Sequence, residues 1–230
     1  MAYNISRKYL NLREDDTILK KSSILTELDE LSKINFEDIT YGLIGEESIT
    51  QHILTKIVKL AKNGDNDIIK FDDSYKETGK NISKTKDGHI QRTCADYVLA
   101  IKNKKGEEHY FSFQAKIGKK KSLGNEYSEI AHRIGNKGPF QIDEYIKFIK
   151  ENNSNSNYPN YINGYYIFYN GNFKNLPNSK YNSYLNEHSF WILKLDQVKK
   201  IMGTAPYKEI SIADVVNSHT DFVGFLRSIV

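Results

Sequence analysis

Apolar residues in this chain recur at helical spacing in some stretches and alternate with polar residues in others. The clearest helical stretch begins after Gly45 and ends at Gly64, and its apolar residues lie three or four positions apart. They are Ile49, Ile53, Ile57 and Leu60. This pattern predicts an amphipathic helix whose first turn carries Glu46 and Glu47.

Three other stretches have helical spacing, at residues 17–31, 140–149 and 210–230. The first predicts a peripheral helix with no Gly or Pro inside it. The second predicts an amphipathic helix that ends in the polar residues 151–153, and the third predicts a helical segment that closes the sequence.

The middle of the chain changes to a period of two, which is typical of strands. Residues 94–101 and 109–117 are rich in β-branched and aromatic side chains and flank a polar turn at 103–106, so they predict an antiparallel hairpin. Residues 68–71 predict a strand before a long exposed loop that runs to residue 90. Residues 165–169 predict a buried strand, and residues 190–195 predict another strand or the start of a helix.

The order of these elements predicts an α/β fold in which a small mixed sheet is flanked by helices. The order is α-β-β-β-α-β, and a length of 230 residues fits one domain over residues 1–230 with its core at about 45–170. The single Cys94 rules out a framework of disulfides, and we expect it to be a buried thiol.

Composition and charge exclude several classes of protein. With 39% hydrophobic and 27% charged residues, the chain has the composition of a folded protein and not of a disordered one. The net charge of +4 is too small for an overall attraction to nucleic acid, so any such contact must be local. Because there is no long apolar run and no apolar leader at the start, we expect a cytoplasmic protein without membrane contact.

The predicted hairpin brings polar groups together on one face. If its turn is centred near Lys105, Asp96 lies opposite Gln114 in the antiparallel ladder. Since side chains alternate along a strand, Ser112, Gln114 and Lys116 then share a face with Asp96. The opposite face is apolar and suited to packing against a helix. It carries Phe111, Phe113 and Ala115.

A carboxylate, an amide oxygen and an ammonium group on one face suit metal-assisted phosphate chemistry. Carboxylate and amide oxygens are the ligands that Mg²⁺ or Mn²⁺ prefers, and a nearby lysine can stabilise negative charge on a phosphate. Glu46 or Glu47 could supply a further carboxylate from the preceding helix. The sequence does not choose between them, and either could instead simply complement the helix dipole.

The arrangement resembles the PD-(D/E)XK nuclease superfamily, and more narrowly the Mrr-like restriction endonucleases and phage-defence effectors in which Gln replaces the acidic residue of the third motif. The resemblance covers residues of roughly 45–169 and implies a restriction-endonuclease-like core. It implies that Asp96, Gln114 and a helical Glu46 or Glu47 bind Mg²⁺, with Mn²⁺ as a substitute. It also implies that Lys116 assists catalysis.

A second match follows the hairpin. Gln141 and Tyr145 have the Gln-x-x-x-Tyr spacing of the helix that follows the lysine strand in RecB-like members of the superfamily. The i and i+4 positions place both on one helix face, where they could reach DNA or the site. Two departures from the family pattern are Ala95, where a proline is usual, and Gln114, which removes one negative charge from the metal site.

The resemblance implies an enzyme, a Mg²⁺-dependent endonuclease that hydrolyses DNA in restriction or phage defence. Double-strand cleavage commonly needs two active sites, which makes a homodimer plausible. Lys119, Lys120 and Lys121 follow the catalytic strand and are candidate DNA contacts, although a solvated loop is an equal alternative. The alternatives in function are a catalytically decayed nucleic-acid-binding module of the same fold and a protein-interaction domain.

Overall fold

The computed structural model describes the central part of the chain in most detail. The described residues are 26, 28, 45–62, 69–71, 83–84, 90–91, 94–102, 105–120, 126–128, 130–131, 133–135, 137–154, 161–169, 190–211, 214–215 and 220–229. Of the peripheral helix predicted at 17–31, only Thr26 and Leu28 are described; both are helical, and Leu28 is buried. The rest of that prediction lies outside the described residues.

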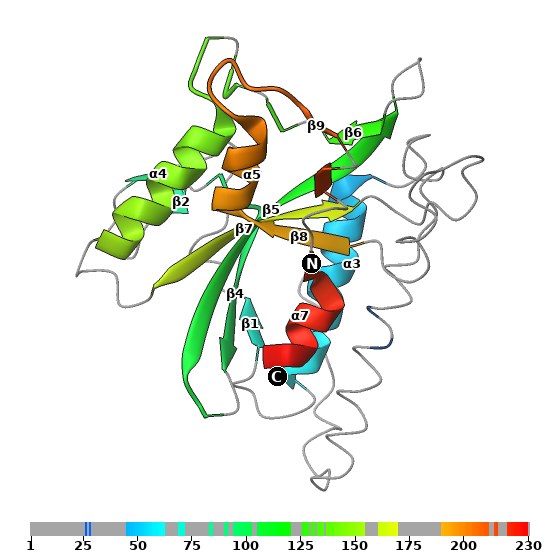
Figure 1. Cartoon of the computed structure of the whole chain (residues 1–230). Coiled ribbons are helices and arrows are strands. Elements are labelled where there is room, and N and C mark those ends of the chain that lie inside the picture. The colour runs from blue at the N-terminus through cyan, green and yellow to red at the C-terminus, as the bar shows by residue number, and fades with distance from the viewer. Residues whose placement is uncertain are drawn as a thin grey trace, which may run out of the picture.

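A mixed sheet forms the centre of the fold (Figure 1). Its longest strand is β5 (Glu108–Lys120), which pairs antiparallel with β4 (Tyr97–Lys102) as the predicted hairpin. On its other side β5 pairs parallel with β7 (Ile162–Tyr169), which in turn pairs antiparallel with β8 (Phe190–Lys194).

Shorter strands complete the sheet. β1 (Ile69–Phe71) pairs with β4, and β10 (Thr220–Asp221) pairs with β8, so the strand order is β1-β4-β5-β7-β8-β10. The far end of β5 pairs with β6 (Glu126–Ser128), which pairs with β9 (Ile210–Ser211). A separate two-stranded sheet joins β2 (Ser83–Lys84) to β3 (Ile90–Gln91).

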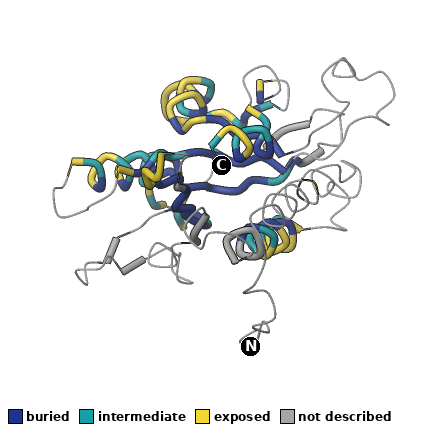
Figure 2. Tube along the Cα trace, turned by 90° about the horizontal axis from the view of Figure 1, so that it is seen from below, coloured by how far each residue is buried: buried dark blue, intermediate teal, exposed yellow. Residues whose placement is uncertain are grey.

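Helices cover both faces of this sheet. α3 (Glu46–Lys62) and α7 (Phe222–Ile229) pack on one face, and α4 (Gln141–Ser154) and α5 (Leu195–Met202) pack on the other. Figure 2 shows the strands as a buried layer, with exposed residues on the outer sides of the helices. The protein is therefore a mixed α/β fold with helices flanking the sheet, as the order of elements predicts. Within the described residues, no helix has both the length and the apolar character needed to span a bilayer.

The first core lies between the sheet and the α3–α7 layer. Alternate residues of β5 point into it, where Phe113 stacks on Tyr97 with ring centroids 5.2 Å apart and meets Phe222 of α7 edge-on at 5.6 Å. The helical spacing read from the sequence places its apolar residues here. From α3 these are Ile49, Ile53 and Ile57, all buried.

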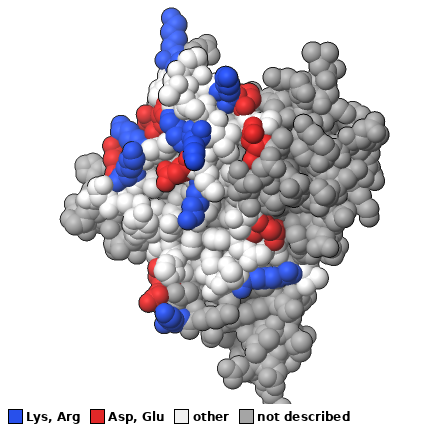
Figure 3. Space-filling view, in the orientation of Figure 1, with Lys and Arg blue, Asp and Glu red and all other residues white. Residues whose placement is uncertain are grey.

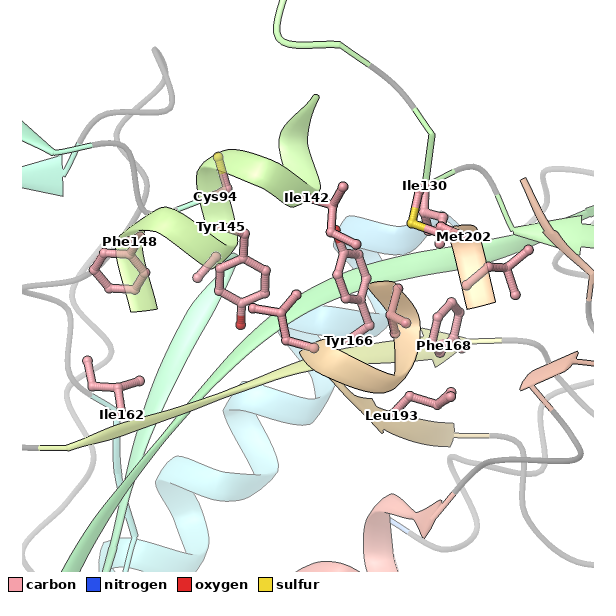
Figure 4. Packing of buried hydrophobic residues seen from close by; sticks show 14 of the residues in the cluster. Cys94, Ile130, Ile142, Tyr145, Phe148, Ile162, Tyr166, Phe168, Leu193 and Met202 are labelled. Carbon is pink, nitrogen blue, oxygen red and sulfur yellow. The ribbon is translucent and has the colours of Figure 1, made fainter. Parts of the chain in front are cut away.

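The second core lies under α4 and α5 (Figure 4). Ile142, Tyr145 and Phe148 of α4 belong to this core, and the Tyr145 ring packs edge-on against Tyr166 of β7, with centroids 5.9 Å apart. Gly164 of β7 is the point of closest approach, because a Cβ there would lie 3.1 Å from both the Ile149 and Leu195 side chains. A side chain at residue 164 would force these two neighbours to move, so glycine favours the close packing of both helices on β7.

Most of the element predictions are confirmed, with some corrections. The helix after Gly45, the strand near 68–71, the hairpin, the helix near 140–149 and the buried strand at 165–169 are all present. Residues 190–195 contain both predicted alternatives, since β8 leads directly into α5. The continuous helical pattern at 210–230 is wrong for its first half, because the short strands β9 and β10 pair there and only α7 is a full helix.

The first core predicts a large loss of stability for Phe113→Ala. This ring is fully buried and touches aromatic side chains from two other elements, so its removal leaves a cavity. We expect the free energy of unfolding to fall by about 3–5 kcal/mol in urea denaturation. Tyr161→Ala is the control, since Tyr161 is 68% exposed and should change stability by less than about 0.5 kcal/mol. Equal effects of the two changes would contradict this account of the core.

Candidate active site

The candidate site lies where β5 continues beyond the start of β4. β4 begins at Tyr97, opposite Phe113, so Gln114 and Lys116 lie past the end of the paired ladder. Asp96 remains next to them because its backbone N–H donates to the Phe113 carbonyl at 2.8 Å. The predicted register, with Asp96 opposite Gln114, is confirmed.

The turn into the site has an unusual backbone. Cys94 is buried and has a φ of 49°, in the left-handed region that a residue with a side chain rarely adopts. The two residues that follow, Ala95 and Asp96, lead from this bend into β4. Such strained positions persist only where the surroundings hold them, and they gather near functional sites.

The Asp96 carboxylate is bound tightly to β5. Its Oδ2 accepts a hydrogen bond from the Ala115 backbone N–H at 2.6 Å and another from Gln114 Nε2 at 2.6 Å. Gln114 Nε2 also donates to the Ala115 carbonyl at 3.2 Å. The carboxylate is therefore fixed in position against the strand that carries Gln114 and Lys116.

Opposing effects act on the charge of Asp96. Burial is the largest and raises the pKa of this carboxyl above its ordinary value. The charge of Lys116 opposes the rise, as do the hydrogen bonds from Ala115 and Gln114, and the charge of Glu47 adds to it. Lys116 itself is only 8% exposed. A buried lysine beside a half-buried aspartate is uncommon unless the two groups are paired or have a functional role.

The two glutamates of the first turn of α3 differ in their relation to Asp96. The charge of Glu47 acts on the pKa of Asp96, whereas the charge of Glu46 acts on that of Tyr169. This end of α3 is attached to the end of β7, because the Thr50 and Tyr169 hydroxyls lie 3.0 Å apart. Both glutamates therefore lie at the end of α3 that is attached to β7, with Glu46 half-buried and Glu47 exposed.

Gln141 joins the site from the start of α4. Its Nε2 donates to Gln114 Oε1 at 3.1 Å, and the residue is 5% exposed. Its own Oε1 is buried and has no hydrogen-bond partner in the described part of the chain. Gln141 thus reaches the site, one of the two positions that the sequence left open for it.

Tyr145, one turn further along α4, is fully buried. Its hydroxyl lies 2.6 Å from Ser112 Oγ and 2.8 Å from the Ser112 carbonyl, and it accepts from the Tyr165 backbone N–H at 3.3 Å. Figure 4 shows its ring pointing from α4 onto the sheet. A side chain with no exposed surface cannot contact DNA, which corrects that expectation; Tyr145 instead fastens α4 to β5 and β7.

A second polar cluster fastens the start of α4 to α5. Asp143 accepts from Lys199 Nζ at 2.6 Å and from the Tyr207 hydroxyl at 2.7 Å, and Lys199 also bonds Tyr207. The Tyr207 ring packs edge-on against Phe140, with centroids 4.7 Å apart. No local spacing in the sequence predicts this cluster, because Asp143 lies 56 residues from Lys199 and 64 from Tyr207.

The structure describes some of the remaining candidate residues but not all of them. Lys119 and Lys120 belong to the end of β5, which pairs there with β6, and Lys121 lies outside the described residues. Cys94 is buried, as expected. The aromatic residues of β7 are buried, as the strand predicted at 165–169 requires; they are Tyr165, Tyr166, Phe168 and Tyr169.

The oxygen donors of the site fit a hard divalent cation. They are the Asp96 carboxylate, the amide oxygen of Gln114 and the carboxylate of Glu47, which come from two strands and a helix. In the described ranges, no group of three or more His, Cys, Asp or Glu residues that could hold a metal ion occurs, and the Gln114 oxygen accepts from Gln141 Nε2. The unpartnered Gln141 oxygen shows that the amides here have hydrogen-bonding capacity to spare.

The fold and the site define a mixed α/β protein with a polar centre on its longest strand, β5, just beyond the start of β4. The chain belongs to DUF6615, a family of unknown function, whose model matches residues 17–223. No match is found among curated proteins. The match covers the sheet, the helices α3, α4 and α5, and every candidate site residue.

The raised pKa of Asp96 predicts a pH-dependent effect of Asp96→Asn. A raised pKa stabilises the fold below the ordinary value of 3.8, and this contribution is lost as the pH rises through the folded-state value. Above that value the buried charge disfavours the fold. We expect Asp96→Asn to be more stable than wild type near neutral pH, with the difference shrinking in acid.

Urea unfolding between about pH 4 and about pH 8 measures this difference. Asp196→Asn is the matched control, because Asp196 is exposed on α5. A wild-type protein that gains stability over Asp96→Asn as the pH rises would contradict the assigned direction.

The bonds of the Tyr145 hydroxyl predict a cost for Tyr145→Phe. The change leaves the ring in place but strips partners from Ser112 and Tyr165, so buried polar groups lose hydrogen bonds. We expect the free energy of unfolding to fall by about 1–3 kcal/mol. Tyr161→Phe, at an exposed tyrosine, should leave it unchanged.

Proposed function

We propose that the protein is a metal-dependent endonuclease of the PD-(D/E)XK type that hydrolyses phosphodiester bonds in DNA, in restriction or phage defence. The observation that carries the proposal is the buried group formed by Asp96, Gln114 and Lys116. These residues share one face of a hairpin, and the charge of Lys116 acts directly on the Asp96 carboxyl. Hydrolysis of a phosphodiester is a reaction in which polar and charged side chains held largely away from water can take part.

The order of elements supports the same proposal. α3 precedes the hairpin, α4 follows it, and β7 returns parallel to the strand that carries Gln114 and Lys116. If only β1, β4 and β5 are counted between α3 and α4, and the short strands β2, β3 and β6 are left out, this order agrees with the α-β-β-β-α-β order that the resemblance implies for a restriction-endonuclease-like core. The assignment to that superfamily is part of the proposal, since a fold alone does not determine a function.

Asp96, Gln114 and Glu47 would hold the metal. Asp96 is kept in place by the Ala115 N–H, so its carboxylate is oriented before any ligand arrives, whereas Gln114 turns an N–H toward Asp96 and its oxygen accepts from Gln141. Bound Mg²⁺, or Mn²⁺ in its place, supplies a Lewis acid that polarises a phosphoryl oxygen and lowers the pKa of a coordinated water. Glu46 is kept as the alternative to Glu47.

Lys116 would act on the phosphate. In hydrolysis the oxygen of water forms a bond to phosphorus while the ester P–O bond breaks, and negative charge builds on the phosphoryl oxygens. An ammonium group held in a nearly buried position stabilises this charge more than an exposed one, because little water screens it. The proton of the attacking water ends on the leaving oxygen or in solvent.

Contact with DNA would be local. On the face shown in Figure 3, positive and negative side chains of the described residues are interspersed over the molecule. That distribution agrees with the small net charge of +4. Lys119, Lys120 and Lys121 remain the proposed backbone contacts, since they extend the strand of the catalytic lysine. A homodimer would supply the two sites that double-strand cleavage needs, and DNA as substrate implies the cytoplasm of a bacterial cell.

Loss of Lys116 or Asp96 is expected to abolish cleavage. Purified protein is incubated with supercoiled plasmid, linear duplex and single-stranded DNA in Mg²⁺, Mn²⁺ or EDTA. We expect metal-dependent cleavage that falls by about 100-fold or more in Lys116→Ala and in Asp96→Ala. Lys200→Ala, at an exposed lysine of α5, is the control and should cleave like wild type. Full activity of the double variant, with folding intact, would rule the proposal out.

The two glutamates of α3 give a matched test of the third metal ligand. Because the charge of Glu47 acts on Asp96, Glu47→Gln should weaken Mg²⁺ binding by about tenfold, measured by calorimetry. Glu46→Gln makes the same chemical change one residue away and should have a much smaller effect. The reverse ranking would assign the ligand to Glu46.

One observation favours a second candidate, a decayed nucleic-acid-binding module of the same fold. Asp96 is already satisfied by the Ala115 and Gln114 N–H groups, so the site is stable as a closed hydrogen-bond network. This candidate predicts DNA binding that weakens with salt, is indifferent to EDTA and is accompanied by no cleavage.

A further inference from the structure

Two glutamine side chains lie in series behind Asp96, and each restricts the other. Gln114 Nε2 donates to Asp96 Oδ2, and Gln114 Oε1 accepts from Gln141 Nε2. The residues are 2% and 5% exposed, so solvent offers few replacement partners. Neither amide can turn without changing the bond that the other makes.

We propose that Gln141 is a positioning residue that determines which atom of Gln114 faces Asp96, and that both amides reverse together when a divalent cation binds. The inference rests on the proposed function, because the cation is the one assigned there. In the described state Gln114 turns an N–H toward the carboxylate. An N–H group is a donor and cannot be a ligand, so binding requires the amide oxygen in its place.

The reversal of Gln114 forces that of Gln141. A primary amide has nearly the same shape when its oxygen and nitrogen exchange places, so a half-turn meets little steric resistance. If Gln114 turned by itself, its Nε2 would face Gln141 Nε2, and two donors would oppose each other in a buried place. If both turn, Gln114 Nε2 donates to Gln141 Oε1.

The second observation is the state of that oxygen. Gln141 Oε1 is buried and without a partner in the described part of the chain, which is uncommon for a buried polar atom. The joint reversal brings this acceptor into use. In the metal-free arrangement Gln141 Oε1 has no donor, and in the reversed arrangement it accepts from Gln114 Nε2.

A carboxylate at position 114 would remove the coupling. It has an oxygen at both ends, so one oxygen accepts from Gln141 Nε2 while the other faces Asp96, and no reversal is required. Gln114→Glu therefore distinguishes two reasons why the Gln141 amide could respond to a cation: a joint reversal of both amides, or the charge of a cation bound close to it. Nearness alone would affect Gln141 in both proteins.

The test follows the side-chain amides by NMR during a Mg²⁺ titration. The sequence contains five glutamines, so isotope-labelled glutamine gives few signals, and substitution assigns each one. We expect the amide signals of Gln114 and Gln141 to move together to one saturation point in wild type. In Gln114→Glu the Gln141 signal should stay nearly fixed. Gln51, exposed on α3, is the internal control.

Binding provides a second measurement. In Gln141→Glu the side chain of residue 141 can only accept while it is ionised, which favours the reversed Gln114. We expect calorimetry to show Mg²⁺ binding about tenfold tighter than in wild type. This measurement does not depend on DNA cleavage. Gln51→Glu adds the same charge on the surface and should change the affinity far less. Unchanged or weaker binding in Gln141→Glu contradicts the inference.

The outcomes separate the inference from the nuclease proposal. If DNA is cleaved and Mg²⁺ binds, but Gln141 stays fixed in wild type or moves equally in Gln114→Glu, the inference is overturned and the nuclease stands. If Mg²⁺ neither binds nor supports cleavage, both are overturned. If Mg²⁺ binds with the joint movement but no substrate is cut, the positioning role is supported and the enzyme activity is not.

Discussion

The strand β5 is covered by helices on both faces, so its side chains must pack against a helix layer on either side. The candidate site follows from this constraint. Because side chains alternate along a strand, Phe113 and Ala115 enter the core under α3 and α7, while Gln114 and Lys116 are directed under α4. The sheet is covered on both faces, so the polar set cannot simply face water. Each polar group on that side needs a partner from another element, and Asp96, Gln141 and Tyr145 meet this need for their neighbours.

The stability of the fold and the chemistry of the site make opposite demands on these residues. The Tyr145 bonds tie α4 to β5 and β7 and favour a single arrangement of the helix. Burial of Asp96 works the other way, because it raises the pKa of a carboxyl that metal binding needs ionised. Lys116 partly offsets this cost. A protein under selection for stability alone would be expected to replace such a group with apolar residues.

The hairpin and its register could be predicted from the sequence because both depend on local patterns. The turn centred near Lys105 and the alternation on either side are enough to place Asp96 opposite Gln114. The same reasoning failed at 210–230, where apolar spacing suggested one helix but β9 and β10 pair with distant strands. It also gave Tyr145 a choice between DNA and the site, since a helix face does not reveal what covers it. The contact of Asp143 with Lys199 and Tyr207 has no local signal at all.

By itself the sequence determined the element types, the faces of the hairpin and the set of residues with suitable chemistry, because these depend on spacing along a short stretch of chain. Only the tertiary structure decided which of them meet. It placed Glu47 where its charge acts on Asp96, buried Tyr145, and joined Gln141 to Gln114 across 27 residues. Those outcomes depend on how α3 and α4 pack on the sheet, and packing is settled by contacts between segments that are far apart in the sequence.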